Sequence, residues 1–360
     1  DLDPTEWEIR EFHVKGGGSK WDQSVRDGTV AYSERVQISA LLSRRVERRL
    51  EAVEAAWADV LRDMEAHAPL YPSLPRTRAR PSTPHLGVLA IQDPHFGMLA
   101  WGKETGEDYD LGRATDAYLS VAKQALATAV QYPLDRVLYL VGNDLAHVDG
   151  QSTDAKGNRR GGATTKGTTQ DVDTRLAKLF TAIRRAVVAV TDHALGCRVP
   201  VDVMVVPGNH DADTMYRLGE VLHAWYRQCP DVRVIYGPEK RKFYGWERVA
   251  LMLTHGEEYR RKRDNLPLIM ATECPAAIWT ASEGGSREVL TGHNHINMAG
   301  GYYPTAEADE SRAIRTRSLP GLTPEDAWHY EEGYKHHRAG TLLMYRPSGF
   351  AGLHEFVPED

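Results

Sequence analysis

The sequence predicts a layered α/β protein in which buried strands alternate with helices. Two observations support this prediction. Five apolar, mostly β-branched segments each run into a polar tip, and helix-like stretches separate most of them. Apolar runs of this length, bounded by glycine or proline, are typical of buried strands. Strands that alternate with helices indicate a sheet with helices packed against it.

Residues 1–67 have a different pattern from the rest of the chain. Residues 1–30 contain two short apolar runs interrupted by three glycines, which predicts a small β element. From Ser33 to His67 apolar residues recur at three- and four-residue steps, which predicts one long amphipathic helix with Ser33 as its N-cap. Arginines give this helix a basic face. It either packs on the domain with that face in solvent, or it is an arm that binds a partner protein or a second copy of the chain.

Residues 68–85 hold five prolines and predict a linker, because proline removes a backbone donor and disfavours helix in the residue before it. The main domain is expected over residues 86–347, with residues 348–360 as a tail. Its strand-like segments are LGVLAIQDPH, RVLYLVGND, VDVMVVPGNH, RVALMLTHG and REVLTGHNH, and TLLMY closes the domain. Helices are expected near 110–131, 172–195, 214–228 and 264–282.

Composition excludes several classes of protein. The chain has 360 residues, 41% hydrophobic and 26% charged, which indicates neither disorder nor a fibre. Its three cysteines show no C-x-x-C spacing, so a disulfide framework is not expected and a reducing cytoplasm fits best. No stretch approaches the roughly 18 apolar residues of a membrane span, so no membrane partner is expected. The net charge of −6 argues against a protein that coats nucleic acid.

Seven residues of metal-binding types fall at or just after the polar tips. They are Asp93, His95, Asp144, Asn209, His255, His293 and His295. Sites in α/β folds lie outside the carboxyl ends of the strands, so these side chains are expected to converge. Carboxylates, imidazoles and one amide together suit a site for two divalent cations.

The motifs DPH, GND, GNHD, THG and GHNH occur in the order found in the calcineurin-like metallophosphoesterases, which the chain resembles over residues 86–347. The resemblance implies a layered α/β/β/α sandwich of two mixed sheets flanked by helices, extended at the N-terminus by the β element and long helix. His147, three residues after Asp144, is similar to the SbcD-type DNA repair exonucleases, and the segment that follows resembles members encoded by bacteriophages. Asn143 departs from the family pattern, in which glycine directly precedes the aspartate.

The family resemblance also implies how the ligands divide between two ions. One ion would be held by Asp93, His95, Asp144 and His295, and the other by Asp144, Asn209, His255 and His293. Asp144 would bridge them. Mixed imidazole and carboxylate ligands favour Mn, Fe, Zn or Ni over Mg, and we expect manganese. A bridging hydroxide between the ions would attack phosphorus in line.

Three further residues are candidates for catalysis. His210 would protonate the leaving alkoxide. Asp211 would either hold the His210 ring in one tautomer or cap the helix that follows. His147 would contact the substrate or assist leaving-group chemistry, or it would be a packed loop histidine.

Two basic segments flank the expected metal ligands and predict an anionic substrate. They contribute Arg159, Arg160 and Lys166 in a glycine- and threonine-rich loop over residues 150–170, and Arg260 and Arg261 shortly after His255. Such residues contact phosphate backbones, although both segments also fit ordinary solvated structure. Trp101, Tyr109 and Tyr259 are candidates for stacking on bases.

These patterns favour a metal-dependent phosphodiesterase that acts on nucleic acid as a DNA exonuclease or endonuclease. One alternative is a small-molecule phosphatase, or a nucleotide or cyclic-nucleotide phosphodiesterase, of the same fold. A second alternative is a scaffold or packaging partner with a vestigial metal site, for which the long N-terminal helix would be the binding arm.

Overall fold

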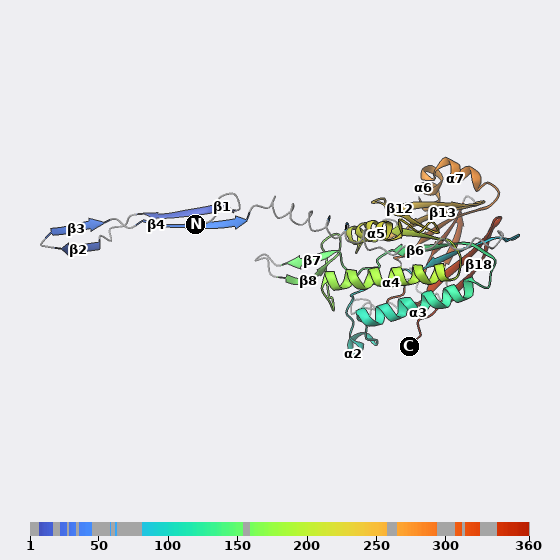
Figure 1. The fold of residues 1–360 in the computed structure, drawn as a ribbon, viewed down its shortest axis with the longest axis horizontal. Coiled ribbons are helices and arrows are strands. Elements are labelled where there is room, and N and C mark those ends of the chain that lie inside the picture. Colours follow the sequence, from blue (N-terminus) through green and yellow to red (C-terminus); the bar gives the residue numbers. More distant parts are fainter. Residues whose placement is uncertain are drawn as a thin grey trace. The chain divides into compact units, whose positions relative to one another are not determined.

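Figure 1 shows a computed structural model of the chain. It describes residues 7–16, 22–26, 29–33, 36–44, 58, 62, 81–153, 159–257, 265–293, 307–311, 314–324 and 337–359. The chain divides into two compact units, Asp1–His67 and Ala68–Asp360.

The first unit contains two antiparallel β-ribbons. β1 (Trp7–Gly16) pairs with β4 (Val36–Arg44). β2 (Asp22–Arg26) pairs with β3 (Thr29–Ser33). Three of these strands begin within the first thirty residues, where the sequence predicts a small β element.

The predicted helix over residues 33–67 is wrong for residues 36–44, which form β4. The apolar residues Val36, Ile38 and Leu42 fit a two-residue period as well as a helical one. Pairing with β1, which a local pattern does not reveal, selects the strand. Ala58 and Arg62 are helical, and the rest of residues 45–67 lies outside the described part.

Two mixed β-sheets form the centre of the second unit. The six-stranded sheet has the order β11 (Val232–Ile235), β10 (Val201–Val206), β6 (Leu134–Gly142), β5 (His85–Ala90), β17 (Gly340–Arg346) and β18 (Gly349–Phe356). The five-stranded sheet has the order β12 (Arg241–Trp246), β13 (Val249–Thr254), β14 (Ser286–Thr291), β16 (Ile314–Ser318) and β15 (Glu307–Ser311). β11, β10, β6 and β5 are parallel, as are β13, β14 and β16, and the other strands pair antiparallel.

Alternate side chains of the strands enter different cores. In β5, Leu86 and Val88 pack between the two sheets, whereas Leu89 packs against the helices on the outer face. In β13, Leu251 faces the other sheet and Met252 faces outwards. Because both faces are buried, these strands read in the sequence as nearly continuous apolar runs.

Helices cover both outer faces of the pair of sheets (Figure 1). The six-stranded sheet is covered by α3 (Leu111–Ala129), α4 (Leu176–Gly196) and α5 (Ala212–Tyr226). The five-stranded sheet is covered by α6 (Leu266–Glu273) and α7 (Ala276–Ala281). The predicted fold class, with two mixed sheets flanked by helices, is confirmed. None of the helices in the described ranges is long and apolar enough to cross a membrane.

Two segments of the second unit differ from the sequence prediction. Residues 348–360, expected to be a tail, contain β18, which pairs with β17 at the edge of the sheet. Gly349 and Gly352 interrupt the apolar alternation of β18, so its sequence pattern is weak. Residues 150–170, expected to be a loop, contain a three-stranded antiparallel sheet. Its strands are β7 (Gly150–Thr153), β8 (Arg159–Ala163) and β9 (Thr169–Gln170). One short helix, α2 (Gly102–Thr105), precedes α3.

Candidate metal centre

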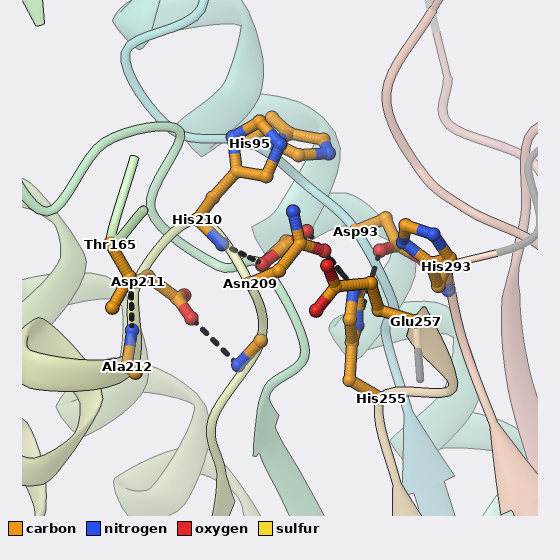
Figure 2. A network of polar contacts seen from close by, with 12 residues as sticks. Asp93, His95, Thr165, Asn209, His210, Asp211, Ala212, His255, Glu257 and His293 are labelled. Atoms are coloured by element: carbon orange, nitrogen blue, oxygen red, sulfur yellow. Dashed lines mark hydrogen bonds and ion pairs between the residues drawn. The ribbon is translucent and has the colours of Figure 1, made fainter. Parts of the chain in front are cut away.

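The polar residues that follow five strands lie together (Figure 2). Asp93 follows β5, Asp144 follows β6 and Asn209 follows β10 in the six-stranded sheet. His255 follows β13 and His293 follows β14 in the five-stranded sheet. Because the parallel strands of a sheet end at the same edge, their carboxyl ends bring these side chains to one place.

Short contacts join these side chains across the two sheets. The Nε2 atom of His255 lies 2.8 Å from Asn209 Oδ1 and 3.1 Å from Asp144 Oδ2. Its Nδ1 atom lies 3.8 Å from Asp93 Oδ1. The backbone N–H of His293 donates to Asp93 Oδ2 at 3.0 Å. The result is one compact cluster of carboxylate, imidazole and amide groups.

Three overlapping groups of side chains could each hold a metal ion, with ligand atoms within 4.8 Å of one another. The groups are Asp93, His95 and Asp144; Asp144, His255 and His293; and His95, His147 and His210. The first two share Asp144, for which the family resemblance implies a bridging position. Six of the seven expected ligands therefore come together, and His295 lies outside the described residues.

The backbone adopts the left-handed conformation at five positions around the cluster. The φ angles are 47° at Asp93, 41° at His95, 51° at Asn143, 60° at Asp144 and 64° at His293. Residues other than glycine rarely adopt positive φ, and those that do gather at functional sites. Hydrogen bonds hold the two loops in place, from Asp93 N–H to the Asn143 carbonyl at 3.0 Å and from His95 N–H to the Asp144 carbonyl at 3.1 Å. Asparagine tolerates this conformation, so the extra residue Asn143 fits the turn.

Two glycines allow the loops to approach the carboxylates closely. A Cβ atom at Gly208 would lie 1.9 Å from Asp144 Oδ1, and one at Gly292 would lie 2.9 Å from Asp93 Oδ2. Any larger residue would displace the carboxylate or the loop. The glycines of GNHD and GHNH therefore have a steric role beside the proposed ligands.

The cluster buries two carboxylates and an imidazole whose charges interact strongly. Asp93 and Asp144 are each 1% exposed, and His255 is 4% exposed. Burial, with a smaller effect of the Asp144 charge, raises the pKa of Asp93 to about 7. Burial opposes ionisation of Asp144 too, but His255 and other histidines hold the pKa of this carboxyl well below its usual range. Burial also lowers the pKa of His255, yet Asp144 and Asp93 outweigh it and raise the pKa to about 9.

The donor atoms of the cluster fit divalent cations. Carboxylate oxygens, imidazole nitrogens and one amide oxygen are the set that borderline transition-metal ions accept. Within the described residues, the buried Nδ1 atom of His255 has no hydrogen-bond partner. A buried polar atom left without a partner costs free energy that a bound ion would recover. A cation would also neutralise Asp93 and Asp144.

His210 lies beside the cluster with its ring orientation fixed (Figure 2). Its backbone N–H donates to Asp144 Oδ1 at 2.8 Å, and its Nδ1 atom lies 2.8 Å from the backbone carbonyl of His147. Because a carbonyl can only accept, Nδ1 carries a proton and Nε2 is left for chemistry. The His147 ring stacks on His210 at a centroid distance of 5.3 Å, and its Nδ1 lies 3.2 Å from His95 Nδ1.

Asp211 occupies the N-cap position of α5, as one of the two expectations has it, but its side chain has a different role. Its carboxylate accepts hydrogen bonds from the N–H groups of Gly208 at 2.9 Å and Ala146 at 3.0 Å. It therefore joins the loop after β10 to the loop after β6. It makes no side-chain cap to α5, and the carbonyl of His147, rather than Asp211, fixes the tautomer of His210. Burial raises the pKa of Asp211 well above its usual range.

Two residues that the sequence analysis did not single out cap α5. Asp149 accepts hydrogen bonds from the N–H groups of Asp213 at 2.9 Å and Thr214 at 2.7 Å. The Thr165 hydroxyl accepts from Ala212 N–H at 3.0 Å and donates to Asp149 at 2.7 Å. An aspartate before glycine is a turn signal, but its partners on α5 lie about 65 residues away in the sequence. No local pattern reveals this pairing.

The residues expected to bind substrate are only partly described. Lys166, in the turn between β8 and β9, forms an ion pair with Glu257, a residue that the sequence analysis missed. Arg159 and Arg160 belong to β8. Arg260 and Arg261 lie outside the described residues.

The aromatic candidates for base stacking differ in exposure. Tyr109 is buried, and its hydroxyl donates to the Pro94 carbonyl at 2.6 Å, so it is not available to a base. Trp101 is 57% exposed, with the Lys103 ammonium 5.5 Å from its ring centroid. Tyr259 lies outside the described residues.

No family model matches this chain, and no curated protein matches it. Solved structures that match include a conserved uncharacterized protein of Streptococcus pneumoniae TIGR4 described as a predicted phosphoesterase (11% identity, TM-score 0.28, covering 76% of this chain and 97% of that one). Another is Chaetomium thermophilum Vps29 (11% identity, TM-score 0.30, 76% and 100%). A third is GAP50, the anchor in the inner membrane complex of Plasmodium (9% identity, TM-score 0.33, 77% and 90%). At these TM-scores the likenesses carry no argument about function.

Proposed function

We propose that this chain is a calcineurin-like metallophosphoesterase that hydrolyses the phosphodiester bonds of nucleic acid, as a DNA exonuclease or endonuclease. The proposal is carried by one observation. Six expected metal ligands from five strand ends meet in one cluster, in the motif order of that family. The ring of His147 beside His210 and the cationic Lys166 near the cluster favour a nucleic-acid substrate over a small ester.

Seven residues would hold the two ions. They are Asp93, His95, Asp144 and His295 for one, and Asp144, Asn209, His255 and His293 for the other. The chemistry that two divalent ions supply when bound, with manganese as the expected metal, is Lewis-acid activation of water and of the phosphate ester.

The proton for the leaving alkoxide would come from His210 Nε2. Its Nδ1–H donates to the carbonyl of His147, so the ring cannot turn away without losing that hydrogen bond. A ring fixed at one nitrogen places the other at a constant position, as general acid catalysis needs. The backbone N–H of His210 also orients the Asp144 carboxylate. His147 would support His210 by stacking and contact the substrate.

The test is an assay of mono- and diesters, including DNA labelled at its 3′ or 5′ end, with Mn²⁺ and with a chelator. We expect Mn²⁺-dependent cleavage of DNA that is lost in Asp144→Asn and in His210→Ala. The size of the first labelled product separates an exonuclease from an endonuclease. Hydrolysis of nucleotides or small esters alone, with every nucleic acid intact, would replace this proposal with a small-molecule phosphoesterase.

Metal content separates an enzyme from a scaffold. We expect about two equivalents of a divalent cation per chain after dialysis against manganese. A chain that binds no divalent cation would contradict the proposal and favour a scaffold or packaging role.

A further inference from the structure

The turn that carries Lys166 is fixed against the segment that carries His210. Within the turn, Gly167 N–H donates to the Thr164 carbonyl at 2.8 Å. The Thr165 hydroxyl accepts from Ala212 N–H at 3.0 Å, two residues after His210. The backbone of Lys166 therefore has a defined position beside the cluster. Only its long side chain, which is 63% exposed, is left to move.

Glu257 approaches the same place from the other sheet. It follows His255 by two residues, and Figure 2 shows its side chain beside Asn209 and His255. Gly256, with φ of 108°, brings this backbone close to the end of β14, where a Cβ would lie 3.2 Å from Thr291 Cβ. The Glu257 side chain is 21% exposed. It adds a carboxylate beside two of the proposed metal ligands, Asn209 and His255.

The ion pair between Lys166 and Glu257 joins these two segments at the rim of the cluster. Without a cation beside it, the Glu257 carboxylate would repel an anionic substrate. An ammonium is a compact charge with three donors, so it can change partners while its backbone stays in place. Exposed lysine–carboxylate pairs are weak and screened by salt. A phosphate that arrives beside Glu257 can therefore compete for Lys166.

On the basis of the proposed function, we infer that Lys166 exchanges Glu257 for a phosphate that flanks the scissile bond, and returns to Glu257 when the product leaves. Lys166 then determines specificity for substrates with at least two neighbouring phosphates, which a polynucleotide has and a small ester lacks. Glu257 competes with the substrate phosphate for Lys166. This competition weakens binding of the polynucleotide and favours its release.

The experiment measures binding of a fluorescent single-stranded phosphorothioate oligonucleotide of about 12 nucleotides by anisotropy over a range of salt concentrations. We expect Lys166→Gln to weaken binding and to lower the slope of log Kd against log salt by about 0.7, the value for one phosphate contact on a single strand. Glu257→Gln is expected to tighten binding by about fivefold, an effect in the range of one exposed charge pair. In the Lys166→Gln background, the same substitution is expected to change Kd by less than about twofold. Lys123→Gln, at an exposed lysine on α3, controls for the loss of one positive charge.

Three outcomes would overturn the inference. An equal effect of Glu257→Gln in both backgrounds would show a general charge effect, and weaker binding would show that Glu257 only positions Lys166. In hydrolysis assays, Lys166→Gln is expected to lower kcat/KM for the oligonucleotide at least about fivefold more than for bis(4-nitrophenyl) phosphate. Equal losses would place Lys166 on the scissile phosphate instead.

The anisotropy measurements of binding do not depend on catalysis, so they test this inference separately from the proposed function. An inactive parent protein with the expected coupling would contradict the function alone. An active parent protein without coupling would contradict the exchange alone.

Discussion

Buried carboxylates near the two ends of β10 have different kinds of partners. Near its start, Asp202 is fully buried and accepts four hydrogen bonds from three side chains. Arg136 Nη1 donates at 2.8 Å, and Arg233 donates from Nε at 3.0 Å and from Nη2 at 2.7 Å. The Tyr244 hydroxyl, from the other sheet, donates at 2.6 Å. The charge and the lone pairs of Asp202 are satisfied by the protein itself.

Beyond the other end of β10, the buried carboxylates of Asp93 and Asp144 lie against the ring of His255. Backbone N–H groups of His293 and His210 donate to Asp93 and Asp144, respectively. A buried charge is expensive unless it is paired. Arginine and tyrosine side chains hold Asp202, whereas the imidazoles around Asp93 and Asp144 are themselves metal-ligand types, so this end of the strand suits a cation.

Asp144→Asn should give the largest effect, because it removes the residue shared by both proposed ion sites. We expect kcat/KM for DNA to fall by at least about 10³-fold, which is about 4 kcal/mol of transition-state stabilisation. Steady-state hydrolysis and metal content measured on the same sample check this. Activity retained with both ions bound would remove Asp144 from the centre and break the contrast with Asp202.

Asp202→Asn should lower the stability of the folded protein and leave its activity unchanged. It leaves Arg136 and Arg233 without a carboxylate, and removing one partner of a buried pair costs about 3–5 kcal/mol. The lower end, about 3 kcal/mol, is expected because the two arginine side chains are 33% and 60% exposed. Urea unfolding measures the cost. Activity per folded molecule should stay within about twofold of the parent, and a larger loss would show that the two ends of β10 are coupled.

Some strands of the molecule could be predicted from the sequence and others could not. Strands such as β5 and β13 are buried on both faces, so each is an apolar run, and the proposed ligands follow as polar tips. The fold class and the convergence of Asp93, Asp144 and His255 follow from that pattern. β4 and β18 could not be predicted in this way, because their sequences fit more than one structure and a partner strand decides between them.

Roles that depend on a distant partner were also beyond the sequence. The sequence predicts that Asp211 either orients its neighbour His210 or caps the following helix, yet its carboxylate accepts a hydrogen bond from Ala146, 65 residues away. Asp149 caps α5 across a similar separation. Glu257 pairs with Lys166, 91 residues away, and the local sequence around Glu257 does not indicate this partner. Each of these residues connects loops that follow different strands, and such connections leave no periodic pattern.

Manganese should stabilise the folded protein by binding at the cluster of Asp93 and Asp144, and not at Asp202. At a Mn²⁺ concentration of about 100 times Kd, the free energy of unfolding should rise by about 2.7 kcal/mol, which raises Tm by roughly 5 °C for a unit of this size. The Asp202→Asn variant should keep this shift, although its Tm starts lower. The Asp144→Asn variant should lose most of it. Thermal unfolding of the three proteins with Mn²⁺ and with a chelator checks this, and equal shifts in all three would place manganese elsewhere.

Gly208→Ala should displace Asp144 sterically without changing any charge in the cluster. The added Cβ would lie 1.9 Å from Asp144 Oδ1 and 2.5 Å from its backbone nitrogen, so the carboxylate or the loop must move. A displacement of about 1 Å costs up to 10²-fold in rate, and we expect a loss of about 10- to 100-fold in kcat. Gly196→Ala is the matched control, because its Cβ would meet no atom within 4 Å. An equal loss in both variants would mean that the position of Asp144 does not limit the reaction. The close approach of the GNHD loop would then serve packing alone, like the contacts around Asp202.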